Sequence, residues 1–305
     1  MRQHSLSIND LILPIFIKEG ENIEEKIQSM PKVYRYSIDR LLWVAERCIS
    51  AGIGAVALFP VNNSKTEDAR EAYNPNNLIC RAIAAVKKRF SNLGVICDIA
   101  LDPYTTHGHD GLVAGGKILN DETVAALCKQ ALVSAEAGAD IVAPSDMMDG
   151  RILSIRKTLD KRGFDNVGIL SYAAKYASNF YSPFRDAIGS AAASCDKSTY
   201  QLDIGNSKEA MRKIAQDAAE GADMIMVKPG MPYLDILKGA SENFALPILV
   251  YQVSGEYAML QAAFRNGWLD EEKTMHEALL GFKRAGATAI FTYAALEVAQ
   301  YINCI

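Results

Sequence analysis

Eight short apolar segments recur along this chain, and most neighbouring pairs are separated by a stretch whose apolar residues have helical spacing. The apolar segments are typical of buried strands, and they span residues 11–17, 54–60, 95–101, 139–144, 167–172, 224–228, 247–252 and 288–293. Strands that alternate with helices form a parallel sheet, and eight such units favour closure into an α/β TIM (β/α)8 barrel. The alternative is an open, doubly wound sheet, which is weakened because no Gly-x-Gly-x-x-Gly motif follows the first strand.

Helix boundaries are marked by recurring small residues. Apolar residues have helical spacing in segments 39–51, 121–137, 207–220 and 271–284. Asp121 is a plausible N-cap of the second of these, and Gly138 a plausible stop. Four phrases with a glycine in second place, three of them Ala-Gly, join helices to the strands that follow: Ala51-Gly-Ile-Gly-Ala, Ala137-Gly-Ala-Asp, Glu220-Gly-Ala-Asp and Ala285-Gly-Ala-Thr. These phrases indicate a helix end followed by a short loop.

Length and composition fit one large domain. The chain has 305 residues, of which half are hydrophobic, so we expect a single barrel domain over 1–305 with residues 1–10 as a short amino-terminal arm. A net charge of −4 gives no basic surface for nucleic acid. The amino terminus lacks a signal peptide's apolar stretch, and no apolar run reaches the ~20 residues that span a bilayer. Six scattered cysteines without a CxxC pair predict reduced thiols and a cytosolic protein: Cys48, Cys80, Cys97, Cys128, Cys195 and Cys304.

Two lysines are out of place. Lys175 and Lys228 each end an apolar segment, although an ammonium prefers water to a buried strand. In α/β enzymes the carboxyl ends of strands carry the chemistry, so both lysines are expected at one face. Two cations in a poorly solvated cleft lower each other's proton affinity, and a neutral amine attacks a ketone to form a Schiff base. Each lysine could instead extend its ammonium from a strand end to solvent.

Two segments are longer than ordinary connections. Residues 60–77 follow the second strand and are polar, and residues 175–203 follow the fifth strand and carry Phe180, Tyr181, Phe184 and Tyr200. In a barrel both would lie on the catalytic face. The second begins at Lys175 and is interpreted as a lid that excludes water, the alternative being a packed surface loop.

The segment after the third strand, from Asp98 to Gly111, holds two histidines and several carboxylates. His107 and His109 are two residues apart and share one side of an extended chain. The group could bind a metal, with magnesium preferring the carboxylates and zinc the histidines. Hydrogen bonding within a polar loop is the equally weighted alternative.

Further polar residues follow the fourth strand. Asp146 could orient a substrate amine, and Arg151 could pair with a carboxylate. Asp149 is better explained as the cap of the next helix.

Other candidates for binding an anionic substrate lie later in the chain. Arg185 and Lys197, in the predicted lid, could meet a substrate carboxylate, although a solvated surface is the commoner place for a single cation. Ser254 and Tyr293 follow strands seven and eight, where barrels often bind anions.

Three motifs together resemble the porphobilinogen synthase (5-aminolevulinate dehydratase) family. They are Ser171-Tyr-Ala-Ala-Lys175-Tyr-Ala-Ser-Asn-Phe-Tyr-Ser-Pro-Phe-Arg185-Asp-Ala, Met226-Val-Lys228-Pro-Gly-Met-Pro-Tyr-Leu-Asp, and Tyr251-Gln-Val-Ser-Gly-Glu-Tyr-Ala-Met. The likeness extends from about Asp10 to the carboxyl terminus. It implies a TIM barrel that condenses two molecules of 5-aminolevulinate to porphobilinogen in tetrapyrrole synthesis.

The resemblance also implies roles for individual residues. Lys228 would form the Schiff base with the A-site substrate, whose carboxylate Arg185 and Lys197 would hold. Lys175 would do so with the P-site substrate, whose carboxylate Ser254 and Tyr293 would hold. Tyr251 is a further candidate for substrate binding, and Asp102, Asp110 and nearby tyrosines are candidates for proton transfer. Lowering a lysine pKa from ~10.4 to near 7 takes ~4–5 kcal/mol of differential stabilisation, which mutual repulsion and burial can supply.

The chain departs from the family pattern at the metal positions. Where zinc-dependent members carry three cysteines, this sequence has Ala100, Asp102 and Asp110, which argues against zinc. Asp102 and Asp110 could bind magnesium or a monovalent cation, or act without metal as acid and base. Members activated by a distal magnesium carry a glutamate where this chain has Lys213, whose ammonium could fill the same electrostatic place.

Assembly and rival functions follow from the same residues. In the family, the amino-terminal arm wraps around a neighbouring subunit of an octamer. The arm of this chain is shorter, so we expect a homo-oligomer that is an octamer or smaller.

The nearest chemical rival is a class I aldolase, which needs one Schiff-base lysine and usually a phosphate site. A rival of another class is a catalytically silent barrel that binds a small carboxylate.

Overall fold

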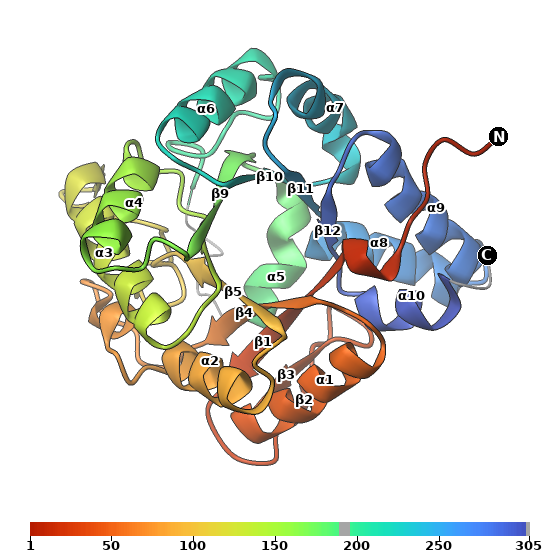
Figure 1. Ribbon diagram of the computed structural model, residues 1–305, viewed down its shortest axis with the longest axis horizontal. Helices are drawn as coiled ribbons and strands as arrows, with labels where there is room; N and C mark the ends of the chain where they lie inside the picture. The colour runs from red at the N-terminus through yellow and green to blue at the C-terminus, as the bar shows by residue number, and fades with distance from the viewer. Residues whose placement is uncertain (189–195, 303–305) are drawn as a thin grey trace.

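The computed structural model describes residues 1–188 and 196–302. Eight parallel strands form a closed barrel in the order β12-β11-β10-β9-β8-β5-β4-β1, with β1 pairing back to β12 (Figure 1). The barrel strands are β1 (Leu11–Lys18), β4 (Ala55–Val61), β5 (Gly94–Ile99), β8 (Ile141–Pro144), β9 (Gly168–Lys175), β10 (Met224–Lys228), β11 (Ile248–Tyr251) and β12 (Ala289–Phe291). The predicted TIM barrel is therefore confirmed, and each predicted apolar segment overlaps one of these strands.

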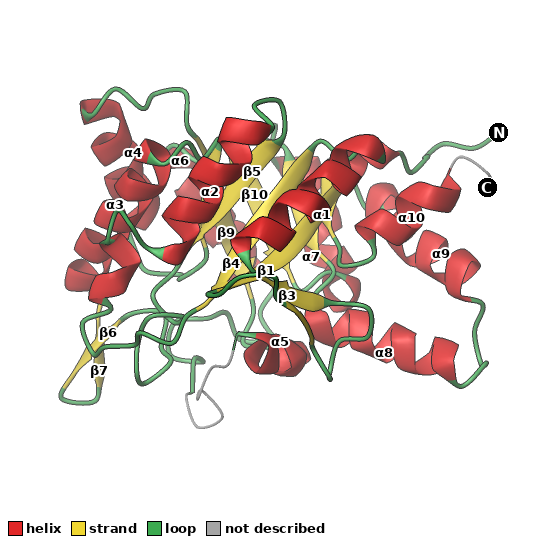
Figure 2. Cartoon of the chain, turned by 90° about the horizontal axis from the view of Figure 1, so that it is seen from below, coloured by secondary structure: helices red, strands yellow, loops and turns green. Residues whose placement is uncertain are grey.

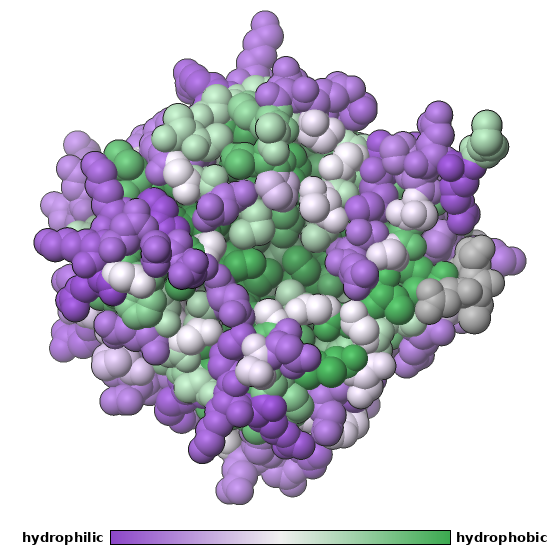
Figure 3. All heavy atoms as spheres, in the orientation of Figure 1, coloured by the Kyte–Doolittle hydropathy of each residue, from purple (hydrophilic) through white to green (hydrophobic). Residues whose placement is uncertain are grey.

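The helices surround the barrel except α5 (Ser182–Ala187), which lies across one end of it, as Figure 1 shows. They are α1 (Ile38–Ser50), α2 (Leu78–Arg89), α3 (Asn120–Glu136), α4 (Arg151–Lys161), α5 (Ser182–Ala187), α6 (Lys208–Ala219), α7 (Leu234–Asn243), α8 (Ser254–Arg265), α9 (Glu271–Arg284) and α10 (Ala295–Tyr301). The strands are buried almost throughout, because the barrel core covers one face and the helices cover the other. The end seen in Figure 3 is apolar at its centre and largely hydrophilic around it.

The four glycine phrases end helices as predicted. Their glycines adopt left-handed backbone angles that residues with a Cβ atom avoid, with φ of +84° at Gly52, +103° at Gly138, +101° at Gly221 and +105° at Gly286. In the two phrases that end in Gly-Ala-Asp the aspartate adds a second function. Asp140 accepts a hydrogen bond from Val95 N, and Asp223 accepts one from Ile169 N, each at 2.7 Å. The carboxylates thus tie the start of one strand to its neighbour.

One helix start differs from the prediction, and two strand pairs were not predicted. Asp121 does not cap α3, because the helix already begins at Asn120, directly after β7 (Lys117–Leu119). β7 pairs with β6 (Leu112–Ala114) in a hairpin, and β2 (Glu24–Lys26) pairs with β3 (Tyr34–Tyr36) in a ribbon beside β1. These strands are short and partly exposed, so they leave no apolar run in the sequence.

The described residues of the segment predicted as a lid, 175–188 and 196–203, lie at the carboxyl end of the barrel (Figure 2), whereas residues 189–195 of that segment lie outside the described residues. The segment contains the 3-10 helix η3 (Asn179–Tyr181) and α5, which lies at the same end as the β6–β7 hairpin (Figure 2). Arg35 in β3 donates hydrogen bonds of 2.6 Å to the carbonyls of Asp186 and Ala187, so the unpredicted ribbon holds the end of α5. A Cβ atom on Gly255 would lie 2.5 Å from the Phe180 carbonyl oxygen, so glycine permits the close packing of η3 on α8.

Other sequence predictions have a partial outcome. Cys48, Cys80, Cys97 and Cys128 are free thiols, whereas Cys195 and Cys304 lie outside the described residues. Across the residues that the structure describes, each helix is too short or too polar to cross a bilayer.

Candidate active site

The two lysines lie side by side at the carboxyl end of the barrel. Lys175 ends β9 and Lys228 ends β10, and the two are direct partners in the parallel pairing of these strands. Each residue is only 7% exposed. The prediction that both lysines reach one face is confirmed, because neighbouring parallel strands that end in register place their last residues together.

Lys228 is surrounded by aromatic rings. Its Nζ lies 4.6 Å from the centre of the Tyr251 ring, and the Tyr172, Phe184 and Tyr181 rings follow at 5.1, 5.3 and 5.4 Å. Burial, followed by the positive charge of Lys175, lowers the pKa of Lys228 to about 7. A large share of Lys228 is therefore a neutral amine at neutral pH, which is the form that attacks carbonyl carbon.

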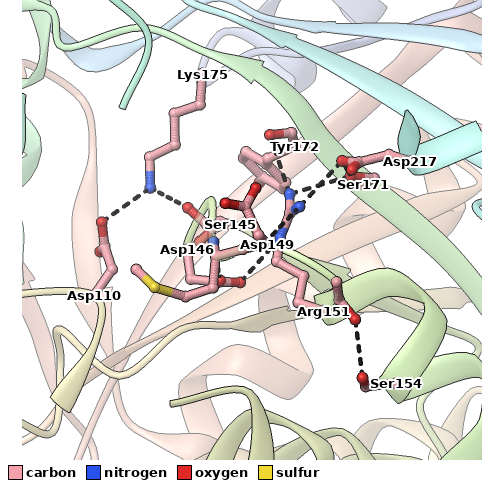
Figure 4. Close-up of polar contacts among 12 residues, drawn as sticks. Asp110, Ser145, Asp146, Asp149, Arg151, Ser154, Ser171, Tyr172, Lys175 and Asp217 are labelled. Atoms are coloured by element: carbon pink, nitrogen blue, oxygen red, sulfur yellow. Dashed lines mark hydrogen bonds and ion pairs between the residues drawn. The ribbon is translucent and has the colours of Figure 1, made fainter. Parts of the chain in front are cut away.

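Lys175 has polar neighbours instead. Its Nζ lies 3.6 Å from Oδ2 of Asp110 and donates a hydrogen bond to the carbonyl oxygen of Ser145 (Figure 4). The two adjacent lysines thus meet different surroundings, one aromatic and one ionic. This difference gives the site two inequivalent amines.

Asp102 and Asp110 share one cation. Nζ of Lys197 lies 3.2 Å from Asp102 and 3.0 Å from Asp110. Burial opposes ionisation of Asp110, but Lys175 and Lys197 outweigh it and lower the pKa of Asp110 to about 2. Burial raises the pKa of Asp102, an effect that Lys197 opposes and the charge of Asp110 reinforces. One carboxyl group is therefore held ionised while the other is easier to protonate.

These residues do not fit a metal ion well. The ammonium of Lys197 already lies between Asp102 and Asp110, and a lysine ammonium cannot act as a ligand. Within residues 1–188 and 196–302, no group of three or more His, Cys, Asp or Glu side chains is arranged to bind a metal. A ring nitrogen of His109 lies 3.3 Å from the Tyr200 hydroxyl, and Nδ1 of His107 accepts from the backbone N–H of His109. His107 thus hydrogen-bonds within its own loop, and His109 contacts a tyrosine of the segment that follows the fifth barrel strand.

A small pocket, about 40 Å³ in volume, lies beside the lysines. Its lining combines the two amines with cations, a carboxylate and apolar side chains: Asp102, Lys175, Tyr181, Phe184, Arg185, Ile188, Lys197, Gln201 and Lys228. The structure thus brings Arg185 and Lys197, both from the predicted lid, to the same pocket as the two lysines. A small ligand with a ketone and a carboxylate would find both an amine and a cation there.

Ser254, Tyr251 and Tyr293 lie behind this pocket. Ser254 accepts a hydrogen bond of 2.9 Å from Phe184 N and donates one of 3.3 Å to the carbonyl of Phe180. The hydroxyl oxygens of Tyr251 and Tyr293 are 3.0 Å apart. The Tyr251 ring lies beside the Lys228 amine, and the Tyr251 hydroxyl contacts that of Tyr293, so the two tyrosines lie on the Lys228 side. Ser254 holds the helix that carries Phe184.

Asp146, predicted to orient a substrate amine, does not line the pocket and is paired with a buried arginine. Asp146 and Arg151 are fully buried side chains, with Asp146 Oδ2 3.3 Å from Arg151 Nε (Figure 4). Arg151 also lies 3.1 Å from Asp217 and donates to the Ser171 hydroxyl. A fully buried carboxylate requires compensation, and Arg151 supplies a cationic partner for Asp146. Asp146 instead accepts a hydrogen bond from Met148 N, which shapes the turn that presents the Ser145 carbonyl to Lys175.

Lys213 lies beneath this network. Its Nζ is 3.1 Å from Asp149 and 3.4 Å from Asp217, and the side chain is 10% exposed. The Lys213 ammonium is therefore paired with two carboxylates, those of Asp149 and Asp217. Asp149 does not cap α4, because Gly150 occupies the N-cap position and the Asp149 side chain is paired with Lys213.

Sequence reasoning did not single out Asp98 as a site residue. Burial and the charge of Asp102 raise its pKa to about 7, against the opposing effect of Lys228 and Lys175. In the part of the chain that the structure describes, Oδ1 of Asp98 is buried and has no hydrogen-bond partner. The available signal was a carboxylate within an apolar strand, since such residues mark functional sites when their pKa is shifted.

Comparisons with known proteins agree in one family. The family model for delta-aminolevulinic acid dehydratase matches residues 1–301. The delta-aminolevulinic acid dehydratase of Bradyrhizobium diazoefficiens is 55% identical over 99% of this chain and 87% of its own length. The enzyme of that name from Rhodobacter capsulatus is 51% identical over 99% and 92%. The solved structure of delta-aminolevulinic acid dehydratase (porphobilinogen synthase) from Toxoplasma gondii, in complex with the reaction product porphobilinogen, is 48% identical. It covers 98% of this chain and 86% of its own, with a TM-score of 0.97.

The buried Arg151 network yields a prediction about stability. Arg151→Met would leave Asp146 and Asp217 buried without their principal cation, and breaking a buried pair in this way costs about 3–5 kcal/mol of unfolding free energy. Arg70→Met removes the same charge from an exposed pair with Asp68, where the expected loss is about 0–1 kcal/mol. Urea unfolding of both variants measures the difference. Equal losses in the two variants would contradict the assignment.

Proposed function

This chain belongs to the delta-aminolevulinic acid dehydratase family, and we propose that it condenses two molecules of 5-aminolevulinate to porphobilinogen through imines on Lys175 and Lys228. The observation that carries this proposal is the pair of adjacent, nearly buried amines in one pocket, one of which has a pKa of about 7. Porphobilinogen is a pyrrole used in tetrapyrrole synthesis, so the enzyme would act in that pathway.

Each lysine would capture one ketone, with loss of one water per imine. An enamine carbon of one bound substrate then attacks the imine carbon of the other, and elimination, with loss of a proton and cleavage of the C–N bond to lysine, releases one lysine. Attack by a substrate amino group on the remaining imine carbon forms an aminal, whose C–N bond to the second lysine breaks to release it, and loss of a proton completes the pyrrole. The balance is two substrates in, one pyrrole and two waters out, with both amines regenerated. The aromatic side chains around Lys228 favour its neutral form and keep water from the imine.

The geometry favours a different pairing of lysines and carboxylate-binding residues from the one that the resemblance implies. Lys197 contacts Asp110, which in turn contacts Lys175, so the lid cations belong on the Lys175 side. Tyr293 contacts Tyr251, whose ring faces Lys228. We therefore assign Arg185 and Lys197 to the substrate on Lys175, and Ser254 and Tyr293 to the substrate on Lys228.

Carboxylates with separated pKa values supply acid and base roles. Asp98, with a pKa of about 7, can donate a proton to a departing water and take one back. Asp110 has a pKa of about 2 and stays ionised, so it stabilises positive charge on Lys175 and its imine. Asp102 can exchange protons once a substrate carboxylate draws Lys197 away from it.

We propose that catalysis requires neither zinc nor magnesium. The support is the ammonium of Lys197, which neutralises the two carboxylates where a metal would otherwise be held. We also propose a cytosolic location, for which the four free thiols are the support, and self-association into a homo-oligomer, as the family resemblance implies.

Trapping of the imines tests the proposed function. Incubation with 5-aminolevulinate and borohydride should reduce the imines and label Lys175 and Lys228, which peptide mass spectrometry locates. Lys228→Ala should fold normally and lose porphobilinogen synthesis altogether, because the other pocket amine, Lys197, is held by Asp102 and Asp110. Wild-type protein that gains label at neither lysine would exclude this mechanism, and so would product formation by the alanine variant.

The pH dependence of labelling follows from the lowered pKa of Lys228. Below pH 7 this lysine is mostly protonated and unreactive, and above pH 7 it is mostly neutral. Its rate of labelling with 5-aminolevulinate and cyanoborohydride should therefore rise through pH 7 and level off. A lysine with the ordinary pKa of ~10.4 would keep gaining reactivity far beyond that point. A rate that still increases above pH 9 would argue against a perturbed amine.

Chelation tests the metal proposal. Since Lys197 already balances Asp102 and Asp110, dialysis against EDTA should leave most of the porphobilinogen synthesis in place. Protein dialysed without chelator is the reference. Loss of activity that added zinc restores would overturn this interpretation of the two carboxylates.

A further inference from the structure

Glu256 is a buried carboxylate outside the substrate pocket. It lies in the first turn of α8 and is completely shielded from solvent. Its two oxygens accept three backbone N–H groups, from Gly230 at 3.1 Å, from Val253 at 2.7 Å and from Met231. Three donors converging on one carboxylate form a strong, charge-assisted contact that fixes the chain segments they belong to.

Those donors come from two strand ends. Gly230 and Met231 immediately follow Lys228 and Pro229, and Val253 follows β11. Only the hydrogen bond from Val253 is needed to begin α8, since it joins Glu256 to the residue preceding the helix. The bonds from Gly230 and Met231 reach across to the chain that carries Lys228, and an ordinary helix cap does not require them.

The backbone of Lys228 is held from the other side as well. Its carbonyl oxygen accepts from Tyr176 N at 3.0 Å and from the Tyr181 hydroxyl at 3.2 Å. Tyr181 also contributes one of the rings around the Lys228 amine. Contacts before and after the residue thus determine where its side chain begins.

The same helical turn also holds the lid segment. Ser254 accepts from Phe184 N, and Gly255 allows the Phe180 carbonyl to approach closely. Phe184 is a second ring around the Lys228 amine. Three successive residues of α8 therefore anchor both the aromatic surroundings of the amine and the backbone that bears it.

We propose that Glu256 is a positioning residue for Lys228: by binding the N–H groups of Gly230 and Met231, its carboxylate keeps the Lys228 amine within its aromatic surroundings and in line with a bound ketone. The inference rests on the proposed imine chemistry. Its rival is a purely structural role, in which Glu256 only caps α8 and its loss weakens the whole fold evenly.

Selective imine trapping separates these roles. Glu256→Gln keeps the size of the side chain but offers one acceptor oxygen and turns an NH2 group toward backbone donors. Asp270→Asn is the matched control, because Asp270 accepts from Lys273 N at the N-cap of α9, and the change likewise converts a capping carboxylate to an amide. Both variants and the wild type are treated with 5-aminolevulinate and borohydride, and the label on each lysine is measured alongside Tm, kcat and KM.

We expect Glu256→Gln to slow labelling of Lys228 by about 10- to 100-fold, the range that a displacement of about 1 Å produces, while Lys175 labels within about twofold of the wild type. The kcat should fall in parallel, and Asp270→Asn should leave both lysines reactive. Lys228 labelled at the wild-type rate in Glu256→Gln would overturn the inference. So would equal losses at both lysines that track a fall in Tm.

Two further outcomes have defined meanings. If Glu256→Gln does not fold, Glu256→Asp keeps the charge but withdraws it by one methylene, and it should show the same selective loss at Lys228 to a smaller degree; wild-type labelling there would contradict the inference. Absence of label on either lysine in the wild type would instead reject the proposed imine chemistry itself.

Discussion

The withdrawal of one lysine amine from water is the constraint on which the rest of the site depends. Lys228 ends a buried strand, its Nζ faces four aromatic rings, and a second lysine ends the neighbouring strand in register. Burial and repulsion both favour the uncharged form, so the amine becomes nucleophilic near neutral pH. The barrel makes this possible, because only neighbouring parallel strands bring two such residues together without solvent between them.

Buried charges require compensation, and the chain provides it in two groups of residues. At the pocket, Asp102 and Asp110 balance the ammonium groups of Lys175 and Lys197. Away from the pocket lining, Arg151 neutralises the buried Asp146 and Asp217, and Lys213 pairs with Asp217 and with the exposed Asp149. The second group shapes the turn bearing the Ser145 carbonyl, which binds Lys175. Charge balance and the position of the amine are thereby linked.

Much of the fold could be predicted because it depends on local signals. Apolar segments identified the eight barrel strands, and the four glycine phrases identified helix ends whose glycines have positive φ. The β2–β3 ribbon and the β6–β7 hairpin escaped prediction, since their residues are partly exposed and carry no apolar run. Asp121 failed as a cap because β7 ends at Leu119 and the helix starts directly after it. The preference of aspartate for the N-cap position was overridden there, because the hairpin fixes where the helix begins.

For the site, the sequence alone determined which chemistry is available: two lysines ending apolar strands, carboxylates after the third strand, and cations in the segment that follows the fifth strand. Tertiary structure alone decided which partner each group meets. Asp146 faces Arg151 instead of the pocket, Lys197 bridges Asp102 and Asp110, and Glu256 reaches the turn after Lys228. The physical reason is that strand periodicity and helix ends are encoded within a few neighbouring residues. Charge pairing and desolvation arise between residues that are distant in sequence and adjacent only after the barrel closes.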